Sequence, residues 1–368
     1  MKGTIIYYGG FSLPDKNAAA NRVVSNGKIF KALGYNVVFL GADYSGEWDN
    51  VHKINDYMFE EGHPHTSKQW LESMVFFKNL KHLTKEYKDI KMIILYNVPF
   101  VTLYLAKKYF KKQGIEVVYD CTEWSQFTEG SLIKRVFKYI DEFFVRKFTY
   151  RVADKIIVIS KLMEKAYSSN NKILKLPPLV DLSDDIWHQS KENSADKFVF
   201  CFAGFPGGNK ENLDLVVDAF MKLEPDEAIL KIAGLEREQF CGMYPTIEPS
   251  SQVEFLGKIT HSETIKQILS CDCYIFIRPS DRRNNAGFPT KFAESYTCGA
   301  RIITTDVSDI RDYTNNSEDF TILDKTDTDI VHKAMLSVVR SKHTQGVKAL
   351  RNDFDYKNYI DKAQHWLN

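Results

Sequence analysis

Several features that would reveal a protein's class are missing from this sequence of 368 residues. No apolar run approaches the ~20 residues of a membrane-spanning helix, and the first residues hold too short an apolar run for a signal peptide. None of the six cysteines forms a C-x-x-C pair, and we interpret them as reduced thiols. The formal net charge of +1 gives no general attraction for nucleic acid. We therefore expect a cytoplasmic protein without a nucleic-acid partner.

Familiar catalytic and cofactor motifs are absent too. The loop after the first predicted strand lacks G-x-G-x-x-G, which argues against a dehydrogenase, and no Gly-x-Ser-x-Gly elbow or Walker loop occurs. His63 and His65 flank a proline, but the histidines show no metal-ligand spacing. We expect no metal site.

What the sequence does contain is a regular alternation of strand and helix patterns, which predicts an α/β fold. We predict an N-terminal domain over residues 1–180, a polar linker at 181–196, a C-terminal domain over 197–352, and a last helix at 353–368 that crosses back to the N-terminal domain. The predicted strands are 3–8, 37–40, 92–96, 116–119, 155–160, 198–203, 229–234, 253–257, 273–277 and 302–306. The predicted helices include 18–33, 68–87, 101–113, 131–154, 212–223, 261–270 and 291–298.

The stretch NNAGFPTKFAESYTCG, residues 284–299, lies between two predicted strands. Parallel sheets bind ligands outside the carboxyl ends of their strands, and a helix start there offers N–H groups to an anion. Gly287 allows close approach of the backbone, Pro289 suits a first helical turn, and Lys291 adds a cation. Glu294 can accept hydrogen bonds from sugar hydroxyls. This combination predicts nucleotide binding; the alternative is an ordinary strand–helix–strand connection.

A second candidate anion site follows the strand at 198–203. Three glycines, at positions 204, 207 and 208, precede Lys210 and the next predicted helix. A glycine-rich turn before a helix, with a lysine, suits a phosphate group. The alternative is a plain turn with a surface lysine.

Polar and aromatic residues also follow the strand at 116–119. Asp120, Glu123 and Trp124 combine two carboxylates, which accept protons of sugar hydroxyls, with a ring that can pack on a sugar. This combination predicts a sugar site in the N-terminal domain. The alternative is that Asp120 caps the next helix and Trp124 belongs to the core.

The motif GFPTKFxESxxCG, residues 287–299, resembles the donor-site signature of the family-four, GT-B-fold retaining glycosyltransferases. The resemblance spans nearly the whole chain and is most specific in the C-terminal half. It implies two Rossmann-like domains facing across a cleft, with a nucleotide-sugar donor in the C-terminal domain and an acceptor in the N-terminal one. The implied reaction is retaining glycosyl transfer without a metal and with no cofactor beside the nucleotide-diphosphate-sugar donor.

The resemblance also implies roles for single residues. Glu294 matches the glutamate that binds ribose, whereas Ala286 occupies the position of a first glutamate that helps to hold the transferred sugar. Lys210 matches a lysine that binds the diphosphate, and Phe205 occupies the position of its partner arginine. The candidates to replace that arginine are Arg278, Arg282 and Arg283.

In the resembled family the loop after the first strand faces the sugar and the acceptor, which implies acceptor contacts for Gly10, Asn17 and Arg22. The alternative is a helix cap at Asn17 and a surface arginine at Arg22. The donor-binding candidates are thus Gly204, Lys210, Arg278, Gly287, Phe288, Pro289, Thr290, Lys291 and Glu294. The catalytic candidates are Asp120, Glu123, Lys210 and Lys291, and the acceptor-binding candidates are Gly10, Asn17, Arg22 and Trp124.

The predicted helix at 131–154 combines six basic residues with a phenylalanine-rich apolar stripe. Such a helix can lie on an anionic membrane, which would place the protein at the inner membrane face. The alternative is that it packs on a sheet with its charges solvated.

The expected partners are a nucleotide-sugar donor and a saccharide or lipid-linked acceptor, in surface polysaccharide or glycan biosynthesis. Two other functions stay open. One is a nucleotide-sugar epimerase of the same fold. The other is a non-catalytic protein that binds a nucleotide or a partner, because Ala286 and Phe205 depart from the family pattern.

Overall fold

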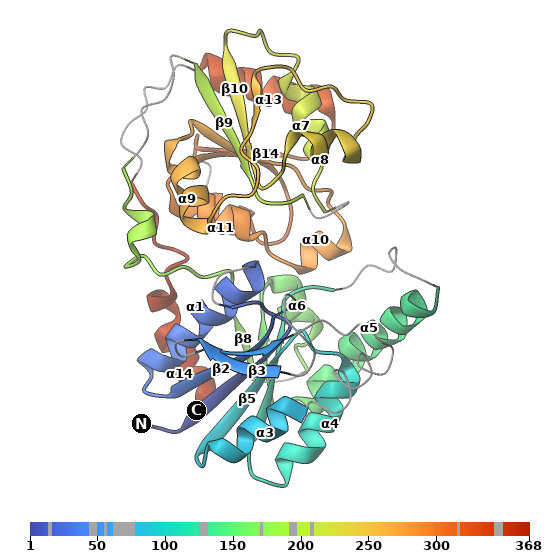
Figure 1. The fold of residues 1–368 in the computed structure, drawn as a ribbon, viewed down its shortest axis with the longest axis vertical. Coiled ribbons are helices and arrows are strands. Elements are labelled where there is room, and N and C mark those ends of the chain that lie inside the picture. Colours follow the sequence, from blue (N-terminus) through green and yellow to red (C-terminus); the bar gives the residue numbers. More distant parts are fainter. Residues whose placement is uncertain are drawn as a thin grey trace. The chain divides into compact units, whose positions relative to one another are not determined.

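The computed structural model describes residues 1–13, 17–43, 50–54, 57–61, 78–124, 132–169, 172–190, 197–206, 210–314, 317–341 and 349–368 (Figure 1). The chain divides into two compact units. The first comprises Met1–Asp181 and Asp355–Asn368, and the second comprises Leu182–Phe354. Each unit has a largely parallel sheet with helices on it, as in a Rossmann-like domain, so the predicted α/β class is confirmed.

The sheet of the first unit has eight strands in the order β3-β4-β2-β1-β5-β6-β7-β8, and only the β3–β4 pair among them is antiparallel. The strands are β1 (Thr4–Gly9), β2 (Asn36–Asp43), β3 (Asn50–Ile54), β4 (Tyr57–Glu61), β5 (Ile90–Tyr96), β6 (Glu116–Cys121), β7 (Lys155–Val158) and β8 (Ile173–Lys175). The helices are α1 (Ala18–Ala32), α3 (Lys78–Glu86), α4 (Phe100–Lys111), α5 (Leu132–Val152), α6 (Lys161–Ala166), η3 (Tyr356–Tyr359) and α14 (Ile360–Leu367). The strand order reverses between β1 and β5, so their carboxyl ends lie where such sheets bind ligands.

The last residues of the chain pack on the first unit. The Tyr356 N–H donates to the Val180 carbonyl at 2.9 Å, and the Trp366 Nε1–H donates to the Lys172 carbonyl at 2.9 Å. Ala363 of α14 joins the same apolar core as Ile29 of α1. Apolar burial against α1 therefore holds this C-terminal segment in place.

The sheet of the second unit has six parallel strands in the order β11-β10-β9-β12-β13-β14. The strands are β9 (Phe198–Ala203), β10 (Ala228–Ala233), β11 (Val253–Phe255), β12 (Cys273–Phe276), β13 (Arg301–Thr305) and β14 (Phe320–Leu323). The helices are η1 (Asp185–Trp187), α7 (Leu213–Phe220), α8 (Arg237–Met243), α9 (His261–Ser270), α10 (Arg282–Ala286), α11 (Thr290–Thr297), α12 (Arg311–Thr314) and α13 (Thr328–Arg340). The strand order reverses between β9 and β12.

Each predicted strand has a counterpart whose ends differ by a few residues. The pattern missed the short strands β3, β4, β8 and β14, which have five residues or fewer. Of the helix predicted at 68–87, α3 is described, and residues 68–77 lie outside the described residues.

The stretch predicted as a linker is described as far as residue 190. Part of it belongs to the second unit, because η1 buries Trp187 and the Gln189 Nε2–H donates to the Ser262 carbonyl at 3.0 Å. Polar composition predicted a linker, but one tryptophan suffices to anchor the segment.

The strands of both units contribute fully buried side chains to the cores. Examples with 0% exposure are Ile6, Ile94, Phe200 and Ile275. Among the helices that the structure describes, none is both long enough and apolar enough to cross a membrane. The two cores therefore account for most of the large apolar side chains, and α5 is the main departure.

Candidate functional site

The predicted donor stretch lies beyond the carboxyl end of β12, next to the end of β9. The sequence predicted a single helix there, but the structure has two, α10 and α11, separated by Gly287–Pro289. Asp281 explains the extra helix, because its side chain accepts a hydrogen bond from the Asn284 N–H at 2.8 Å. Gly299 follows α11 with φ of 69°, the left-handed conformation predicted for the end of this helix.

Two hydrogen bonds brace the turn between α10 and α11. Ser308, after β13, has φ of 57°, which is uncommon for a residue other than glycine. Its N–H donates to Asn285 Oδ1 at 2.9 Å, and its hydroxyl donates to the Gly287 carbonyl. Gly287 itself has φ of −73°, which any residue can adopt, so backbone conformation alone does not require glycine there.

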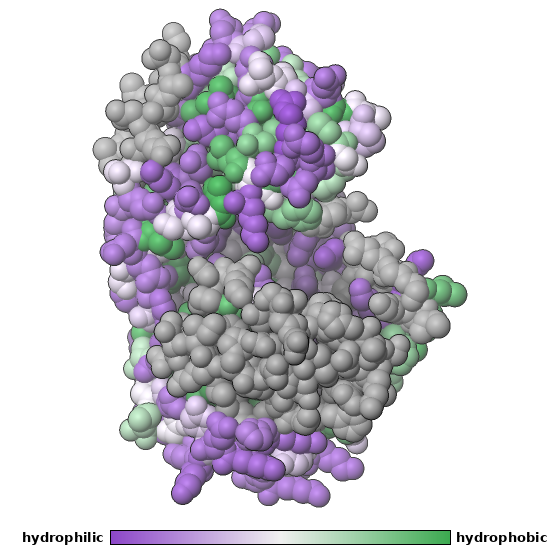
Figure 2. Space-filling view, viewed as in Figure 1, coloured by the Kyte–Doolittle hydropathy of each residue, from purple (hydrophilic) through white to green (hydrophobic). Residues whose placement is uncertain are grey.

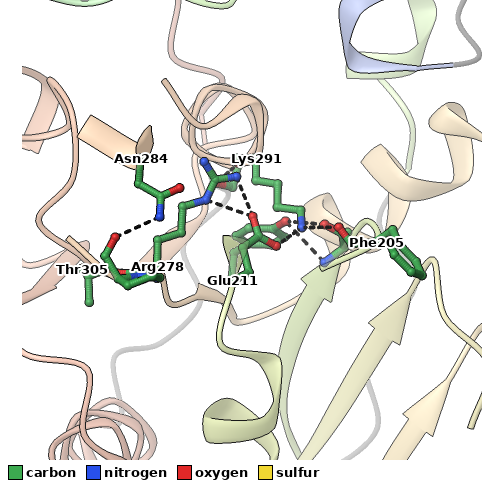
Figure 3. Close-up of polar contacts among 10 residues, drawn as sticks. Phe205, Glu211, Arg278, Asn284, Lys291 and Thr305 are labelled. Atoms are coloured by element: carbon green, nitrogen blue, oxygen red, sulfur yellow. Dashed lines mark hydrogen bonds and ion pairs between the residues drawn. The ribbon is translucent and has the colours of Figure 1, made fainter. Parts of the chain in front are cut away.

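Three charged side chains contact one another near the start of α11 (Figure 3). Glu211 is 3% exposed, and its Oε1 accepts from Nε and Nη2 of Arg278 at 3.0 and 2.6 Å. Its Oε2 forms an ion pair with the Lys291 ammonium group. Glu211 precedes α7, Arg278 follows β12, and Lys291 lies in α11, so three segments meet at one carboxylate. We call these three residues the charge cluster; two cations and one anion give it a formal charge of +1.

Lys291 is enclosed by residues at the end of β9. Its ammonium nitrogen lies 4.3 Å from the centroid of the Phe202 ring and 3.5 Å from the Phe205 carbonyl oxygen. A Cβ atom on Gly204 would lie 2.8 Å from Lys291 Cε, and Gly204 has φ of 101°. The candidate Gly204 thus makes room for the lysine chain and permits the turn in the backbone.

The pKa values of the charge cluster follow from burial and charge. Burial lowers the pKa of Lys291, and the attraction of Glu211 opposes this without cancelling it. Burial alone would raise the pKa of Glu211, but Lys291 and Arg278 outweigh it and hold that pKa below its ordinary value. The carboxylate is therefore ionised at neutral pH and neutralises only one of the two cations.

The neighbouring glycine turn is described in part. Gly207 and Gly208 lie outside the described residues, as do His63 and His65. Lys210 is half-buried and directly precedes Glu211, which brings it to the same strand end as the charge cluster. Phe205, at the position of the family arginine, is 58% exposed. Arg278 is the arginine that lies beside Lys291, and the exposed Arg282 and the half-buried Arg283 lie in α10 instead.

Glu294, the predicted ribose ligand, forms a hydrogen bond to a histidine of a neighbouring helix. Its Oε1 lies 2.9 Å from His261 Nε2, and His261 is the first residue of α9. Thr260 and Glu263 fix that helix start by a reciprocal capping box. No motif marked His261 in the sequence, because its relation to Glu294 depends on the packing of α9 beside α11.

Other residues of the donor stretch hold it to the core. Phe288 is buried against Tyr313 and Phe354, with ring centroids 5.8 Å away in each case. Ala286, at the position of the family's first glutamate, has 0% exposure. Pro289 is buried and occupies the position before α11, and Thr290 begins the helix. Phe288 and Pro289 thus anchor the turn that positions Lys291.

In the first unit, the candidates Arg22 and Asp120 form a buried ion pair. Arg22 Nη2 lies 3.0 Å from Asp120 Oδ1, and Asp120 has 0% exposure. Asp120 Oδ2 also accepts from the Tyr7 hydroxyl and from Asn26 Nδ2. Another Arg22 nitrogen, Nη1, donates to the Leu176 carbonyl at 3.0 Å.

These contacts place Arg22 and Asp120 inside the unit instead of on its surface. Burial raises the pKa of the Tyr7 hydroxyl well above its ordinary value, and the charge of Asp120 adds to this, so Tyr7 donates as a neutral phenol. Neither Tyr7 nor Asn26 was among the site residues predicted from the sequence. The spacing of four between Arg22 and Asn26, on a helix face that also buries apolar residues, was the available signal.

The other candidates of the first unit differ in exposure. Asn17 is the N-cap of α1, and its Oδ1 accepts from the Ala20 N–H at 2.8 Å, as the capping alternative proposed. Trp124 is 5% exposed, with the Arg146 guanidinium 5.0 Å from its ring. Glu123 and Gly10 are exposed. Glu123 is thus the predicted carboxylate of this unit that a ligand can reach.

No metal-binding cluster occurs among the residues that the structure describes, where no three His, Cys, Asp or Glu side chains gather suitably. The charged groups at the reversal point of the second sheet are instead the charge cluster, Lys210 and the Glu294–His261 pair. The cations can bind an anionic group, and the nearby Glu294 carboxylate can accept hydrogen bonds from hydroxyl groups of the same ligand.

The fold is similar to that of several solved structures. A sucrose-phosphate synthase of Thermosynechococcus elongatus is 13% identical, with a TM-score of 0.71 over 99% of this chain and 98% of that one. The HepE protein of Anabaena, solved with UDP and glucose, is 12% identical, with a TM-score of 0.66 over 100% and 99%. A UDP-GlcNAc 2-epimerase of Methanocaldococcus jannaschii is 10% identical, with a TM-score of 0.58 over 100% and 99%. At these identities the similarity shows a shared fold.

A family comparison goes further than the fold. Residues 183–360 match the model of the family described as glycosyl transferases group 1, and this segment contains the charge cluster and Glu294. No curated protein sequence matches the chain. Residues 183–360 therefore form a group 1 glycosyltransferase domain, of the kind that transfers a sugar from a nucleotide sugar, and the chain as a whole has the GT-B fold.

Proposed function

We propose that this protein transfers a sugar from a nucleotide-diphosphate sugar to a saccharide or lipid-linked acceptor, with retention of configuration and without a metal ion. The observation that carries the proposal is the charge cluster. Burying a charge without a partner is costly, and two cations around Glu211 leave one positive charge to be neutralised. A diphosphate beside Arg278 and Lys291 supplies that negative charge.

The position of the cluster fits the leaving group of such a reaction. Lys291 lies in the first turn of α11, where the helix dipole also favours negative charge. Lys210 adds a third cation at the neighbouring strand end. In this proposal these groups stabilise the negative charge that develops on the departing diphosphate. In other enzymes a metal ion stabilises this charge.

The Glu294–His261 pair serves the nucleoside part of the donor. His261 holds Oε1 of the carboxylate, so the orientation of Glu294 is fixed before a ligand binds. In the proposal the carboxylate accepts hydrogen bonds from the ribose hydroxyls. The distance along α11 between Lys291 and Glu294 is about one turn, which suits a ribose linked to a diphosphate.

On the acceptor side, we assign no role to Asp120, because its carboxylate is engaged inside the first unit. Glu123 is exposed after β6 and is the candidate that orients an acceptor hydroxyl. The leaving phosphate oxygen takes the proton of that hydroxyl while the new glycosidic bond forms on the same face of the sugar. Retention then needs no protein nucleophile.

A thermal-shift panel of nucleoside diphosphates and their sugars first identifies the donor. The purified chain is then incubated with that donor, with and without a chelator, and its products are separated and examined by NMR. The proposal expects release of the nucleoside diphosphate with the α or β configuration of the donor kept in the product. Activity lost with chelator and restored by manganese would contradict the metal-independent step.

The same experiment separates the alternatives. The fold is shared with the epimerase described above, and an epimerase would give a new nucleotide sugar or a free epimer. A non-catalytic protein would raise its melting temperature with the nucleotide and leave the donor intact. Transfer to added saccharide, or slow hydrolysis with retention, identifies a transferase.

A further inference from the structure

Helix α5 of the first unit has two halves in different surroundings. Its C-terminal half packs on α4, where Phe144 and Phe148 lie 5.4 and 6.4 Å from Phe100 between ring centroids. Within that unit, the first turns of α5 project beyond α4 and the sheet (Figure 1). The projecting half is therefore not stabilised by burial in the domain.

Large apolar side chains are exposed along this projecting half and into the middle of the helix. Leu132, Val136, Tyr139, Ile140 and Phe143 recur at helical spacing and form one stripe, here called the α5 stripe. Their exposed fractions are 74%, 49%, 60%, 47% and 48%. Figure 2 shows hydrophobic surface at the projecting end of the helix. Contiguous exposed apolar surface of this kind marks an interaction site.

The exposed charges described on the helix of the α5 stripe have one sign. The exposed charged side chains described on α5 are all basic, namely Arg135, Lys138, Lys147 and Arg151. The helix has two acidic residues. Glu142 is buried, and the Asp141 carboxylate accepts a hydrogen bond from the Phe100 N–H at 2.8 Å, at the start of α4. The adjoining α4 contains no acidic residue. Among the side chains described on α5 and α4, the exposed surface is thus apolar and cationic.

We propose that the α5 stripe docks this protein on an anionic lipid bilayer. Its apolar side chains would enter the boundary between headgroups and acyl chains, while the long basic side chains reach the phosphates. A second copy of this chain is a poor occupant, because pairing two α5 stripes would bring the basic side chains of both copies together. An anionic bilayer offers both an apolar interior and negative charge.

This proposal does not depend on the nucleotide site. It concerns a helix of the first unit, whereas the charge cluster and Glu294 belong to the second. Failure of membrane binding would leave the transferase proposal intact, and an inactive protein could still bind vesicles. If both hold, the bilayer is the place where a lipid-linked acceptor is met.

The test is co-sedimentation of the full-length chain with vesicles of two compositions. One is phosphatidylcholine alone, and the other is phosphatidylcholine with phosphatidylglycerol. We expect binding to the anionic vesicles and little to the neutral ones. Binding must weaken at high salt, since the Debye length falls to ~3 Å at molar ionic strength.

Variants assign the binding to α5. Arg135→Glu with Lys138→Glu reverses two charges, and Val136→Ser with Ile140→Ser removes apolar surface without changing charge. Each pair should weaken partitioning by roughly tenfold or more. The matched control, Lys333→Glu with Arg340→Glu, makes the same charge change on exposed positions of α13 and should bind as the unaltered chain does. Circular dichroism and melting temperature confirm that each variant is folded.

Three results would overturn the proposal. One is the absence of binding to anionic vesicles. Another is an equal loss for the α5 charge variant and the α13 control, which would show that net charge alone matters. The third is self-association in analytical ultracentrifugation that Val136→Ser with Ile140→Ser abolishes, because the stripe would then be covered by a second copy.

Discussion

Glu211 and Lys291 form a largely buried ion pair although they are 80 positions apart in the chain. The pair joins the loop before α7 to the first turn of α11, and Arg278 binds the other oxygen of the same carboxylate. Strand order explains the meeting, because β9 and β12 are neighbours and parallel. The anion site of the proposed reaction is therefore organised by a carboxylate.

Glu211→Gln should destabilise the second unit. Glutamine keeps the shape of the side chain but leaves two buried cations without a counter-charge, so we expect a loss of about 3–5 kcal/mol in the free energy of unfolding. Urea denaturation measures it. Glu254→Gln, at an exposed position of β11, is the control and should change stability by no more than about 0.5 kcal/mol. Similar stability of the two variants would mean that the ion pairs contribute little.

The contribution of Glu211 should depend on pH. Burial opposes its ionisation, but Lys291 and Arg278 outweigh burial and hold its folded pKa below the ordinary value of an unfolded chain. A folded pKa below the unfolded one gives stability that is complete above the unfolded pKa and is lost as pH falls through the folded pKa. The stability gap between the native chain and Glu211→Gln should be constant near neutrality and shrink in acid. A gap that widens in acid would contradict this assignment.

Lys291→Ala and Lys210→Ala should weaken nucleoside diphosphate binding far more than nucleoside binding. A hydrogen bond to a charged group contributes about 1.5–3 kcal/mol, so the loss in diphosphate affinity should be roughly 10–150-fold. Isothermal titration calorimetry with both ligands measures it. Lys325→Ala, at an exposed position of the same unit, is the control. Equal losses for the two ligands would point to misfolding or to another site.

Glu294→Gln should remove selectivity for ribose. The amide keeps the shape but loses charged acceptance, and we expect a cost of about 1.5–3 kcal/mol in nucleotide affinity. The ribo and 2′-deoxyribo forms of one nucleotide are compared in the native chain and the variant. The native chain should prefer the ribo form, and the variant should bind the two nearly alike. Unchanged affinity for the ribo form would show that Glu294 does not bind the ribose and only forms its hydrogen bond to His261.

Asp120→Asn should act mainly on stability. It leaves Arg22 buried without its counter-charge, so we expect a loss of about 3–5 kcal/mol, and Arg22→Met in the same chain should recover part of it. Glu123→Gln, at the neighbouring exposed carboxylate, should leave stability within about 0.5 kcal/mol and slow transfer instead. An Asp120→Asn protein that is fully stable but inactive would restore the catalytic interpretation of this residue.

The sequence alone predicted much of the architecture, because strands and helices are local patterns. Apolar runs rich in aromatic or β-branched residues predicted β9 and β12, and a glycine predicted the end of α11, where Gly299 has the expected left-handed conformation. The motif at 287–299 predicted the family of the C-terminal part, and the match over residues 183–360 confirms it.

Tertiary structure decided which charged side chains meet. Asp120 follows the strand predicted at 116–119, and Arg22 lies in the helix predicted after the first strand, so both were candidates for a binding site. Only the contact between α1 and β6 shows that they neutralise each other in the interior. No sequence pattern marked Glu211, which directly follows the predicted Lys210. Its partners, Arg278 after β12 and Lys291 in α11, are distant in the sequence. The sequence also could not show that the α5 stripe is exposed. An amphipathic pattern specifies an apolar face, but what covers that face depends on contacts between distant segments.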